Sequence, residues 1–550
     1  MKSRQDHYRK RWTALKSERS SLWGDWQQLS DNILGHRGRF LVNDRNKSKR
    51  NYNILNNTGK LALRTLASGM MAGITSPARP WFKLATPNHQ MMDDQGVKQW
   101  LSDVERRMRE VFNQSNVYNV LHSNYAELGG FGTGVMGVYE DFDNVIRCVP
   151  YTVGSYALGT NGRNEVDTFY REYQQSVGQV VSEFGYENCS RSVQQNWDRG
   201  NTESWVNILH VVEPNDDRDQ QSPMARDKKF RSVYVEIQAT NNDQFLKESG
   251  FDEFPVMAPR WDVVGGDIYA TSCPGMDALG DIKALQLHEK RKSQAIDKLV
   301  DPPLQAPISM QSQVQGGGFM PGEIEFVADT GNGIRSIYDF RPDIGALGAD
   351  IREDEMRVKR AFYEDLFLML ANTDRRQITA REIEEKHEEK LLMLGPVLER
   401  LHNELLNPLI KRTFNIMSRA GIFPDPPQAL QNTEVKVEYI SVLAQAQRLT
   451  AVAGIERFSG YVSNMMQSFP EIRHKFDALQ SADEYAEAVG ISPRMVRDDN
   501  TVEQRMLAEQ QQQQQAQAME MAQSGAQTAK TMSETDTESP SALARVMGLS

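Results

Sequence analysis

Apolar side chains recur at helical spacing along the first hundred residues of the chain. The clearest stripe has intervals of three or four positions and consists of Trp23, Trp26, Leu29 and Ile33. Side chains at this spacing share one face of a helix, and an apolar face of this kind is normally buried. The same periodicity over residues 57–71 and 94–113 predicts two further helices. The chain therefore begins as a helix-rich segment.

Between residues 134 and 270 the pattern changes to short runs of β-branched and aromatic residues. WVNILHVVEP at 205–214 and RSVYVEIQAT at 231–240 are examples, and Asp, Asn and Gly separate such runs. This composition predicts strands joined by turns, with one helix near residues 174–186. Helices followed by hairpins, without regular alternation of strand and helix, indicate a helix-rich α+β fold.

Two long helices are predicted in the second half of the chain, with a small β segment between them. The first spans residues 276–300 and ends at the Asp-Pro-Pro of 301–303, because proline rings cannot continue a helix. The second spans about 344–370, and the Gly-, Pro- and Gln-rich stretch before it contains one predicted strand at 323–328. At 1.5 Å per residue each helix would be roughly 37 Å long. Helices of this length indicate an elongated projection.

A kinked helix is predicted after this projection. The polar loop NTDRRQ at 372–377 precedes Thr379 and Glu382, which have the spacing of a helix-capping box. The long helix that begins there should bend at Pro396 and at Pro408, because each proline removes a backbone donor.

The last part of the chain is predicted to contain a strand, further helices and a tail. The strand lies at 435–440 and the helices extend to about residue 510. Residues 511–550 are rich in Gln, Ala, Ser and Thr. This composition buries too little apolar surface to offset the entropy lost on ordering, so we expect the tail to be disordered.

Charge and composition exclude several classes of protein. The 550 residues include 63 basic and 74 acidic side chains, and the net charge of −11 excludes coating of nucleic acid by bulk charge. The mean hydropathy is −0.58, and the absence of a long uncharged apolar run predicts no membrane span. The N-terminus lacks the apolar core of a signal peptide, and the three cysteines are scattered without a CxxC pair. We therefore expect synthesis in the cytosol, reduced thiols and no metal site.

No motif in the sequence indicates catalysis. The segment GTGVMG at 132–137 matches the dinucleotide pattern GxGxxG, but a predicted helix precedes it and a strand follows, the reverse of a nucleotide-binding loop. We expect a flexible joint there. Glu384 and His387 share a helix face, yet a di-metal bundle needs a second such pair and two more glutamates. His210 lies in a predicted strand and is expected to be structural. We expect no enzyme activity and no cofactor.

Two stretches of the sequence closely resemble one known family. They are LASGMMAGITSPARPWFKL at Leu66–Leu84 and ITAREIEEKHEEKLLMLGPVLERLHNELLNPLIKRTFNIMSRAGIFPDPP at Ile378–Pro427. Both are similar to the head-to-tail connecting (portal) proteins of short-tailed, podovirus-type tailed phages. The resemblance covers about residues 9–510 in the order and type of segments. It implies a ring, usually of twelve subunits, at one vertex of the capsid.

The resemblance assigns each predicted segment to a part of a ring subunit. It implies a wing at 1–275 and 379–434, stem helices at 276–300 and 344–371, a small β-containing clip at 301–343, a channel-facing tunnel loop at 372–378, a helical crown at 435–510 and the glutamine-rich tail at 511–550. Such a ring is implied to nucleate the prohead, to conduct double-stranded DNA during packaging and ejection, and to seat the tail. The implied partners are further copies of the chain, double-stranded DNA, the terminase large subunit, tail adaptor and tail proteins, and major capsid and scaffolding proteins, with no membrane. The implied location is the portal vertex of the virion, after assembly in the host cytoplasm.

The resemblance also indicates which basic residues meet the DNA. Two candidates lie on the tunnel loop and three on the first stem helix: Arg375, Arg376, Lys290, Arg291 and Lys292. Every basic group that neutralises a phosphate adds affinity by releasing counterions, so a conduit should carry few of them. Contacts would be to the DNA backbone, without sequence preference. Ion pairing between subunits is the alternative role of these five residues.

Two other functions stay open from the sequence. A DNA-processing packaging nuclease would need clustered carboxylates for metal-assisted hydrolysis. The compact acidic candidate is Glu140-Asp141-Phe142-Asp143, a pattern more typical of a hairpin turn. A tail adaptor ring is the other alternative, although adaptors are usually much shorter chains.

Overall fold

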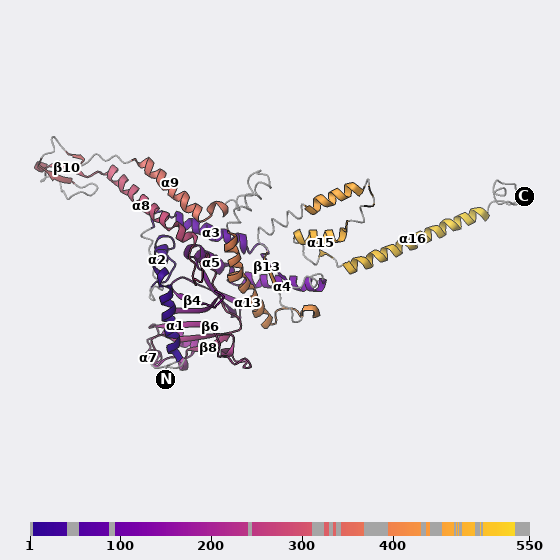
Figure 1. The fold of residues 1–550 in the computed structure, drawn as a ribbon, viewed down its shortest axis with the longest axis horizontal. Helices are drawn as coiled ribbons and strands as arrows, with labels where there is room; N and C mark the ends of the chain where they lie inside the picture. The colour runs from indigo at the N-terminus through magenta and orange to yellow at the C-terminus, as the bar shows by residue number, and fades with distance from the viewer. Residues whose placement is uncertain are drawn as a thin grey trace. The chain divides into compact units, whose positions relative to one another are not determined.

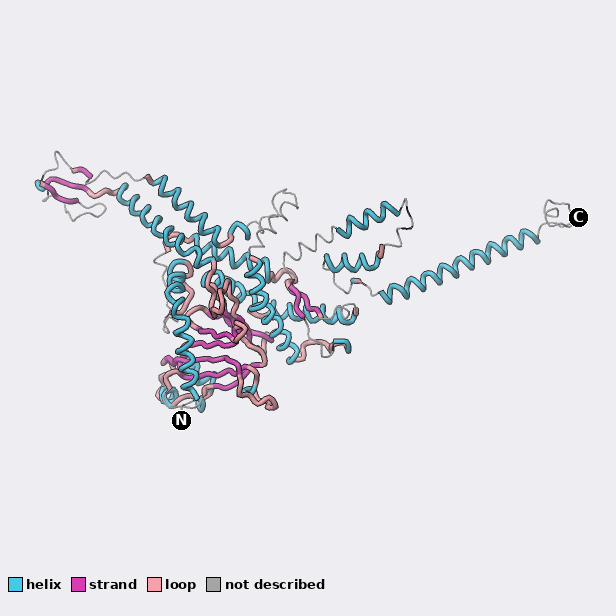
Figure 2. The backbone as a smooth tube through the Cα atoms, viewed as in Figure 1, coloured by secondary structure: helices cyan, strands magenta, loops and turns pink. Residues whose placement is uncertain are grey.

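The computed structural model divides the chain into two compact units. The first consists of Met1–Ala85, Asp103–Asp425 and Val435–Ala444, and the second of Thr86–Ser102, Pro426–Glu434 and Gln445–Ser550. The structure describes residues 4–40, 54–86, 94–239, 245–310, 324–328, 334–336, 343–367, 394–430, 436–439, 454–466, 469, 471, 476–489, 495–496 and 499–533. Both helices and strands are present (Figure 1, Figure 2), which confirms the predicted α+β class.

The predicted helices of the first hundred residues are present. The helices before the strand-rich region are α1 (Arg4–Glu18), the 3-10 turn η1 (Arg19–Leu22), α2 (Trp23–Asn32), α3 (Thr58–Ile74), α4 (Gln95–Gln114) and α5 (Val117–Phe131). Three members of the predicted stripe, Trp26, Leu29 and Ile33, are fully buried, and the fourth, Trp23, is half-buried. Arg19 lies between two indole rings, 5.3 Å from the ring of Trp12 and 5.0 Å from that of Trp23.

A five-stranded antiparallel sheet fills much of the predicted strand-rich region. Its strands are hydrogen-bonded in the order β4-β5-β6-β7-β8, so neighbours in the sheet are neighbours in sequence. They span Tyr156–Thr160, Val166–Ser176, Trp205–Pro214, Phe230–Glu236 and Lys247–Phe251. The prediction of strands in this part of the chain is confirmed.

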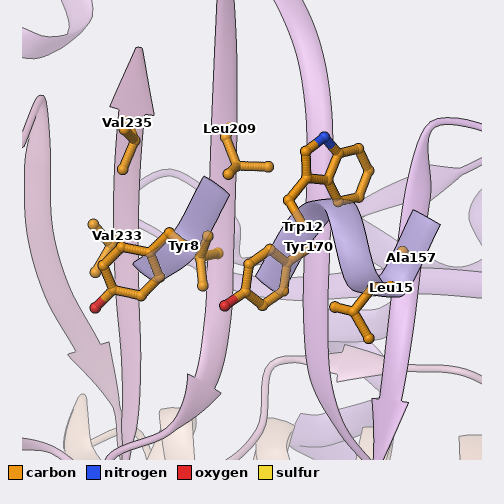
Figure 3. Close-up of a cluster of buried hydrophobic side chains, with 9 residues drawn as sticks. Tyr8, Trp12, Leu15, Ala157, Tyr170, Leu209, Val233 and Val235 are labelled. Atoms are coloured by element: carbon orange, nitrogen blue, oxygen red, sulfur yellow. The ribbon is translucent and has the colours of Figure 1, made fainter. Parts of the chain in front are cut away.

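Helices cover both faces of this sheet. Successive side chains of a strand point to opposite sides, so each strand places apolar side chains on both faces. The helices concerned are α1, α6 (Val177–Phe184) and α7 (Arg191–Asp198). On one face, Tyr8 and Trp12 of α1 pack with Leu209 of β6 (Figure 3). Ile208, one position away on the same strand, belongs to the core under α6 and α7. The core is therefore two apolar layers separated by the sheet.

Smaller sheets join segments that are far apart in the sequence. Their strands are β1 (Phe82–Ala85) with β13 (Lys436–Tyr439), and β2 (Val135–Asp141) with β3 (Val145–Tyr151) and β9 (Val256–Met257). The strand that we expected to open the crown is thus β13, and it pairs antiparallel with β1 inside the first unit. The boundary drawn at residue 435 differs from the structure for this reason.

Two antiparallel helices and a small sheet form what we call the two-helix projection (Figure 1). It consists of α8 (Pro274–Val300), β10 (Leu304–Pro307), β11 (Ile324–Val327), β12 (Arg335–Ser336) and α9 (Ile344–Ala361). The predicted end of the first helix is confirmed. The second helix is shorter than the predicted 344–371, because Tyr363 has a left-handed backbone with φ of 55° that interrupts the helix.

The long kinked helix is described from residue 394 onward. It consists of α12 (Gly395–Leu401), a π-helical turn at His402–Leu406 and α13 (Asn407–Arg419). The π turn has a simple cause, since Pro408 has no N–H to donate to the carbonyl of Glu404 and the N–H of Asn407 reaches His402 instead. The predicted irregularity at Pro408 is confirmed, whereas the predicted capping box and helix start at 379–382 lie outside the described residues.

The described part of the second unit is helical and contradicts one expectation. Residues 454–466 are helical, followed by α15 (Ala478–Val489) and α16 (Asp499–Ser533). The prediction of a disordered tail is wrong for residues 511–533, which lie in α16; the side chains of residues 511–519, 521–524 and 527 are exposed. Gln, Ala, Met and Glu are good helix formers, so this stretch is helical without burying an apolar face.

Among the described residues, none of the helices has the length and apolar character needed to span a membrane.

The β2–β3 hairpin turns through a strained residue. Asp141 pairs with Val145 across a three-residue loop, and Val145 has a φ of 67° where glycine or asparagine is usual. Val145→Gly should therefore raise the free energy of unfolding by about 1 kcal/mol. Urea unfolding measures this, with Val149→Gly farther along β3 as a control that should destabilise. Equal or lower stability of Val145→Gly would contradict the strain.

Candidate nucleic-acid interface

Helix α8 carries the three basic residues that are described and were predicted to meet DNA. Lys290 and Arg291 are exposed and Lys292 is half-buried. Helix α8 carries five basic and four acidic side chains, and α9 carries four of each. The two helices are thus nearly neutral in a chain whose net charge is −11, so local cationic groups on them are not cancelled by a strongly acidic background.

The ion pairs of the projection involve α9 rather than this basic triplet. Arg357 pairs with Glu353, and that hydrogen bond raises the pKa of Arg357 above its ordinary value. His288 Nδ1 lies 2.8 Å from Asp354 Oδ2, a carboxylate that is almost fully buried between the helices. Within the described part of the chain, the triplet Lys290–Lys292 forms no ion pair. Its charge is therefore available to a partner.

A loop from the N-terminal region locks the two helices together. The side-chain oxygen of Gln286 accepts from the backbone N–H of Leu55 at 2.6 Å and of Asn56 at 2.8 Å. Asn56 Nδ2 in turn donates to Glu289 at 3.1 Å and to Glu355 at 2.8 Å. One amide group thus bridges α8 and α9. No sequence signal could have identified Asn56, because it lies 233 positions from Glu289.

The start of α8 is packed against the glycine-rich segment at 129–134. Cys273 caps the helix by accepting from the N–H of Met276, and burial raises the pKa of its thiol to about 12, so it stays protonated. Gly275 contacts the backbone of Gly130 so closely that a Cβ there would overlap the carbonyl oxygen. All residues from Gly129 to Val138 are buried. The expectation of a flexible joint at 132–137 is therefore wrong, since these glycines allow close packing.

Hydrogen bonds join the loop before α8 to the same glycine-rich segment. Trp261 N–H donates to the carbonyl of Gly132 at 2.8 Å, and Gly134 N–H donates to Pro259 at 3.1 Å. Gly132 ends α5 with a φ of 85°, and β2 follows, so the helix precedes the strand as predicted. A dinucleotide-binding loop has the opposite order, in which a strand leads into the N-terminus of a helix and the pyrophosphate binds at that N-terminus. This segment therefore does not have the geometry of such a loop.

A buried ion pair ties this loop to the π turn of the kinked helix. Arg260 Nη2 lies 2.6 Å from Glu404 Oε1, and Glu404 Oε2 also accepts from the backbone N–H of Arg260 at 2.8 Å. The remaining donors of Arg260 bond to carbonyl oxygens, including Asn164 at 2.9 Å. The pair therefore fixes α12 and α13 to the segment that leads into α8.

The alternative catalytic candidates have structural roles. Residues 142–144 form the turn of the β2–β3 hairpin, as predicted, and Glu140 accepts from Arg419 at 2.8 Å. His210 is stacked on Tyr234 at 4.1 Å, and burial lowers its pKa to about 3, which makes it a neutral core residue. Across the described residues, no three His, Cys, Asp or Glu side chains gather closely enough to hold a metal ion.

The structure places three of the five predicted DNA-facing residues. Lys290, Arg291 and Lys292 lie together on α8. Arg375 and Arg376 fall in the segment 368–393, outside the described residues, as do Glu384 and His387. That the three residues of α8 meet DNA stays a prediction, and the contacts that hold α8 in place were not foreseen from the sequence.

Comparison with known proteins agrees with this architecture. The family model for bacteriophage head to tail connecting proteins matches residues 5–496. The chain is 46% identical over 535 residues to the portal protein of Salmonella phage epsilon15, which covers 97% of this chain and 96% of that protein. It is also 46% identical over 541 residues to the probable portal protein of Bordetella phage BPP-1, covering 98% of this chain and 96% of that one. The chain belongs to the bacteriophage head-to-tail connecting (portal) protein family and acts as a head-tail connector.

Proposed function

We propose that copies of this chain, twelve in a closed ring, occupy one capsid vertex, and that double-stranded DNA passes along the basic side of α8. The observation that carries this proposal is the triplet Lys290, Arg291 and Lys292 on a nearly neutral two-helix projection. The first two side chains are exposed, the third is half-buried, and none of them has an ion-pair partner among the described residues. The family match and the two portal relatives support the ring.

The two-helix projection carries nearly equal numbers of basic and acidic side chains, which suits a channel through which DNA slides better than a site that binds DNA tightly. Affinity for DNA falls steeply with salt in proportion to the number of phosphates neutralised. A few basic groups per subunit provide weak, reversible contacts to the backbone, whereas a strongly basic wall would retain the duplex. Arg375 and Arg376 would add a second set of contacts. Because phosphate contacts carry no sequence information, passage should be independent of the genome sequence.

The remaining surfaces are assigned by their place in the chain. The small sheet β11-β10-β12 lies beyond the far ends of α8 and α9. It would be the clip, which contacts terminase during packaging and the tail adaptor afterwards. The wing, with its five-stranded sheet, would contact the capsid and scaffolding proteins, and residues beyond Tyr439 would form the crown. The ring would assemble in the host cytoplasm and remain in the virion.

Neutralising the basic triplet should weaken DNA binding without affecting assembly. For the triple variant Lys290→Gln, Arg291→Gln and Lys292→Gln, we expect negative-stain images of closed rings like those of the parent chain. The slope of log K against log salt for a short duplex should become shallower by roughly 0.9 for each phosphate that the variant no longer neutralises. Fluorescence anisotropy over a salt series measures this slope, and two duplexes of different sequence should give the same value.

The matched control removes the same charge from the wing. Arg163, Arg191 and Arg199 are exposed on the β-rich part of the first unit, and their replacement by glutamine should leave the slope unchanged. An unchanged slope in the α8 variant would remove the triplet from the DNA path. Failure of the parent chain to form rings under any condition would overturn the connector assembly itself.

A further inference from the structure

Helices α3 and α5 form a surface with almost no acidic side chains. The two helices pack against each other at the base of the two-helix projection (Figure 1). Helix α3 contains Lys60 and Arg64 and no acidic residue. Helix α5 contains a single acid, Glu127, which is only 3% exposed and pairs with Arg37 at 3.2 Å. In a chain with a net charge of −11, the outer sides of these two helices are therefore a local basic surface.

Three polar side chains of α3 lie in a row on this surface. Lys60, Arg64 and Ser68 are exposed and are four positions apart, so each lies one turn beyond the previous one on the same helix face. The hydroxyl of Ser68 lies 3.3 Å from Nε2 of His122, which is half-buried on α5. A guanidinium, a hydroxyl and an imidazole thus lie together across two adjacent helices, and we call Arg64, Ser68 and His122 the α3–α5 cluster.

The protein does not neutralise the basic groups of this cluster. Burial lowers the pKa of His122, and the cations of Arg37 and Arg64 lower it further, so both guanidinium groups act on the imidazole. The guanidinium of Arg37 already pairs with Glu127 and donates to the carbonyl of Ser123 at 3.0 Å. Arg64 has no ion-pair partner among the described residues. Its charge is therefore available to a ligand.

These three groups are suited to binding phosphate. Arginine presents paired N–H donors that match two oxygens of one phosphate, and a serine hydroxyl donates a further hydrogen bond. The imidazole of His122 adds an N–H donor in either protonation state. A single exposed arginine on a helix carries no such meaning, but here donors from two helices lie together without a competing carboxylate.

The extent of the basic row favours a polymer over a single anion. Lys60 lies eight positions before Ser68, which places the two roughly 12 Å apart along the axis of α3. A single phosphate could contact one end of this row only. A nucleic-acid backbone carries a negative charge at every nucleotide, so it can follow the row over its length.

We infer that the α3–α5 cluster binds phosphate groups of the DNA backbone, with Lys60 contacting a further phosphate of the same duplex. The inference rests on the proposed function and deepens it, because it adds a contact surface at the base of the two-helix projection to the one on α8. Such contacts carry no sequence information, so they suit passage of any genome.

Directed cleavage of DNA tests whether a duplex lies on this surface. Asn119 is exposed one turn before His122 on α5, and the three native cysteines are buried. Asn119→Cys in assembled rings can therefore be modified selectively with an iron–EDTA tether, which should cut a bound duplex after addition of ascorbate and peroxide. Ser192→Cys on α7 is equally exposed and should give at least fivefold less cleavage. Equal cleavage from the two positions would overturn the inference.

Removing the donors tests the cluster itself. Arg64→Gln with His122→Gln should reduce cleavage from Asn119→Cys at least fivefold. It should also make the slope of log K against log salt shallower by roughly 0.9 for each phosphate no longer neutralised. The control Arg199→Gln with His7→Gln removes the same residue types from exposed positions elsewhere in the first unit and should change neither value. An unchanged slope, in rings that circular dichroism and negative stain show to be folded and closed, would contradict the assignment.

The outcomes separate this inference from the proposed function. If the α8 triple variant makes the salt slope shallower and the Arg64–His122 variant does not, the DNA path along α8 stands and the α3–α5 site is overturned. If neither variant changes the slope of rings that bind DNA, both are overturned. Arg64–His122 rings that bind DNA like the parent but fail to enter particles would show that the surface binds a protein, which also overturns the inference.

Discussion

Replacing Glu404 by alanine is expected to lower the free energy of unfolding by about 3 kcal/mol. The carboxylate bonds to Arg260 through both oxygens, and the guanidinium is only 5% exposed. Removing one partner leaves a buried cation with carbonyl oxygens alone, among them Asn164 and Asp267. Glu404→Gln keeps an acceptor of the same shape and should cost about half as much, since a hydrogen bond to a charged group exceeds a neutral one by roughly a factor of two.

Urea unfolding followed by tryptophan fluorescence measures this difference, at one protein concentration because ring assembly adds to apparent stability. The exposed pair Arg357–Glu353 on α9 is the control, and Glu353→Ala should change stability by less than about 0.5 kcal/mol. The double variant Arg260→Met with Glu404→Met removes both charges and should be more stable than Glu404→Ala. If Glu404→Ala and Glu353→Ala have the same effect, the buried pair does not hold the π turn in place.

This ion pair shows where prediction from sequence stops. Pro408 was enough to predict a bend, because a missing N–H is a local property of the chain. The partner of Glu404 could not be predicted, because Arg260 lies 144 positions earlier and many other basic residues were available. The proline therefore predicted the irregular turn, whereas the ion pair between this turn and Arg260 depends on tertiary packing.

The candidate site likewise has features that the sequence predicts and features that it does not. Proline at 302 and 303 marks the end of α8, and the strands of the five-stranded sheet follow from β-branched runs, so the two-helix projection and the large sheet were predictable. The end of α9 at Ala361 was not, because the apolar spacing continues to Met369 while Tyr363 leaves the helix to stack on Trp261. The bridge made by Asn56 likewise joins segments with no common pattern.

The two stretches that resemble portal proteins meet the projection at its base. Gly69, in the first stretch, lies against the ring of Phe367 with no room for a Cβ. Phe367 immediately precedes the segment 368–393 that carries Arg375 and Arg376. Glu404, in the second stretch, holds the loop that leads into α8. Both stretches therefore contain residues that fix where the two helices leave the rest of the first unit.

The base of α8 should be the most sensitive point of this arrangement, and Gly275→Ala should lower the free energy of unfolding by about 2 kcal/mol. The added Cβ would overlap the carbonyl oxygen of Gly130, which is backbone and cannot rotate away. Gly280→Ala on the same helix is the matched control, since nothing lies within 4 Å of its Cβ position. It should stabilise the helix by up to about 1 kcal/mol, as alanine is the better helix former.

The consequence for function follows from the length of the helix. Helix α8 has 27 residues and extends roughly 40 Å, so a small tilt at Gly275 moves its far end by several times the displacement at the base. We therefore expect Gly275→Ala rings to lose symmetry beyond α8 in averaged images and to bind DNA with a salt slope that differs from the parent chain. Gly280→Ala rings should match the parent in both. If both glycine variants behave alike in stability and in images, close packing at Gly275 does not direct the projection, and other contacts, such as the Asn56 bridge and the Arg260–Glu404 pair, set the orientation of α8.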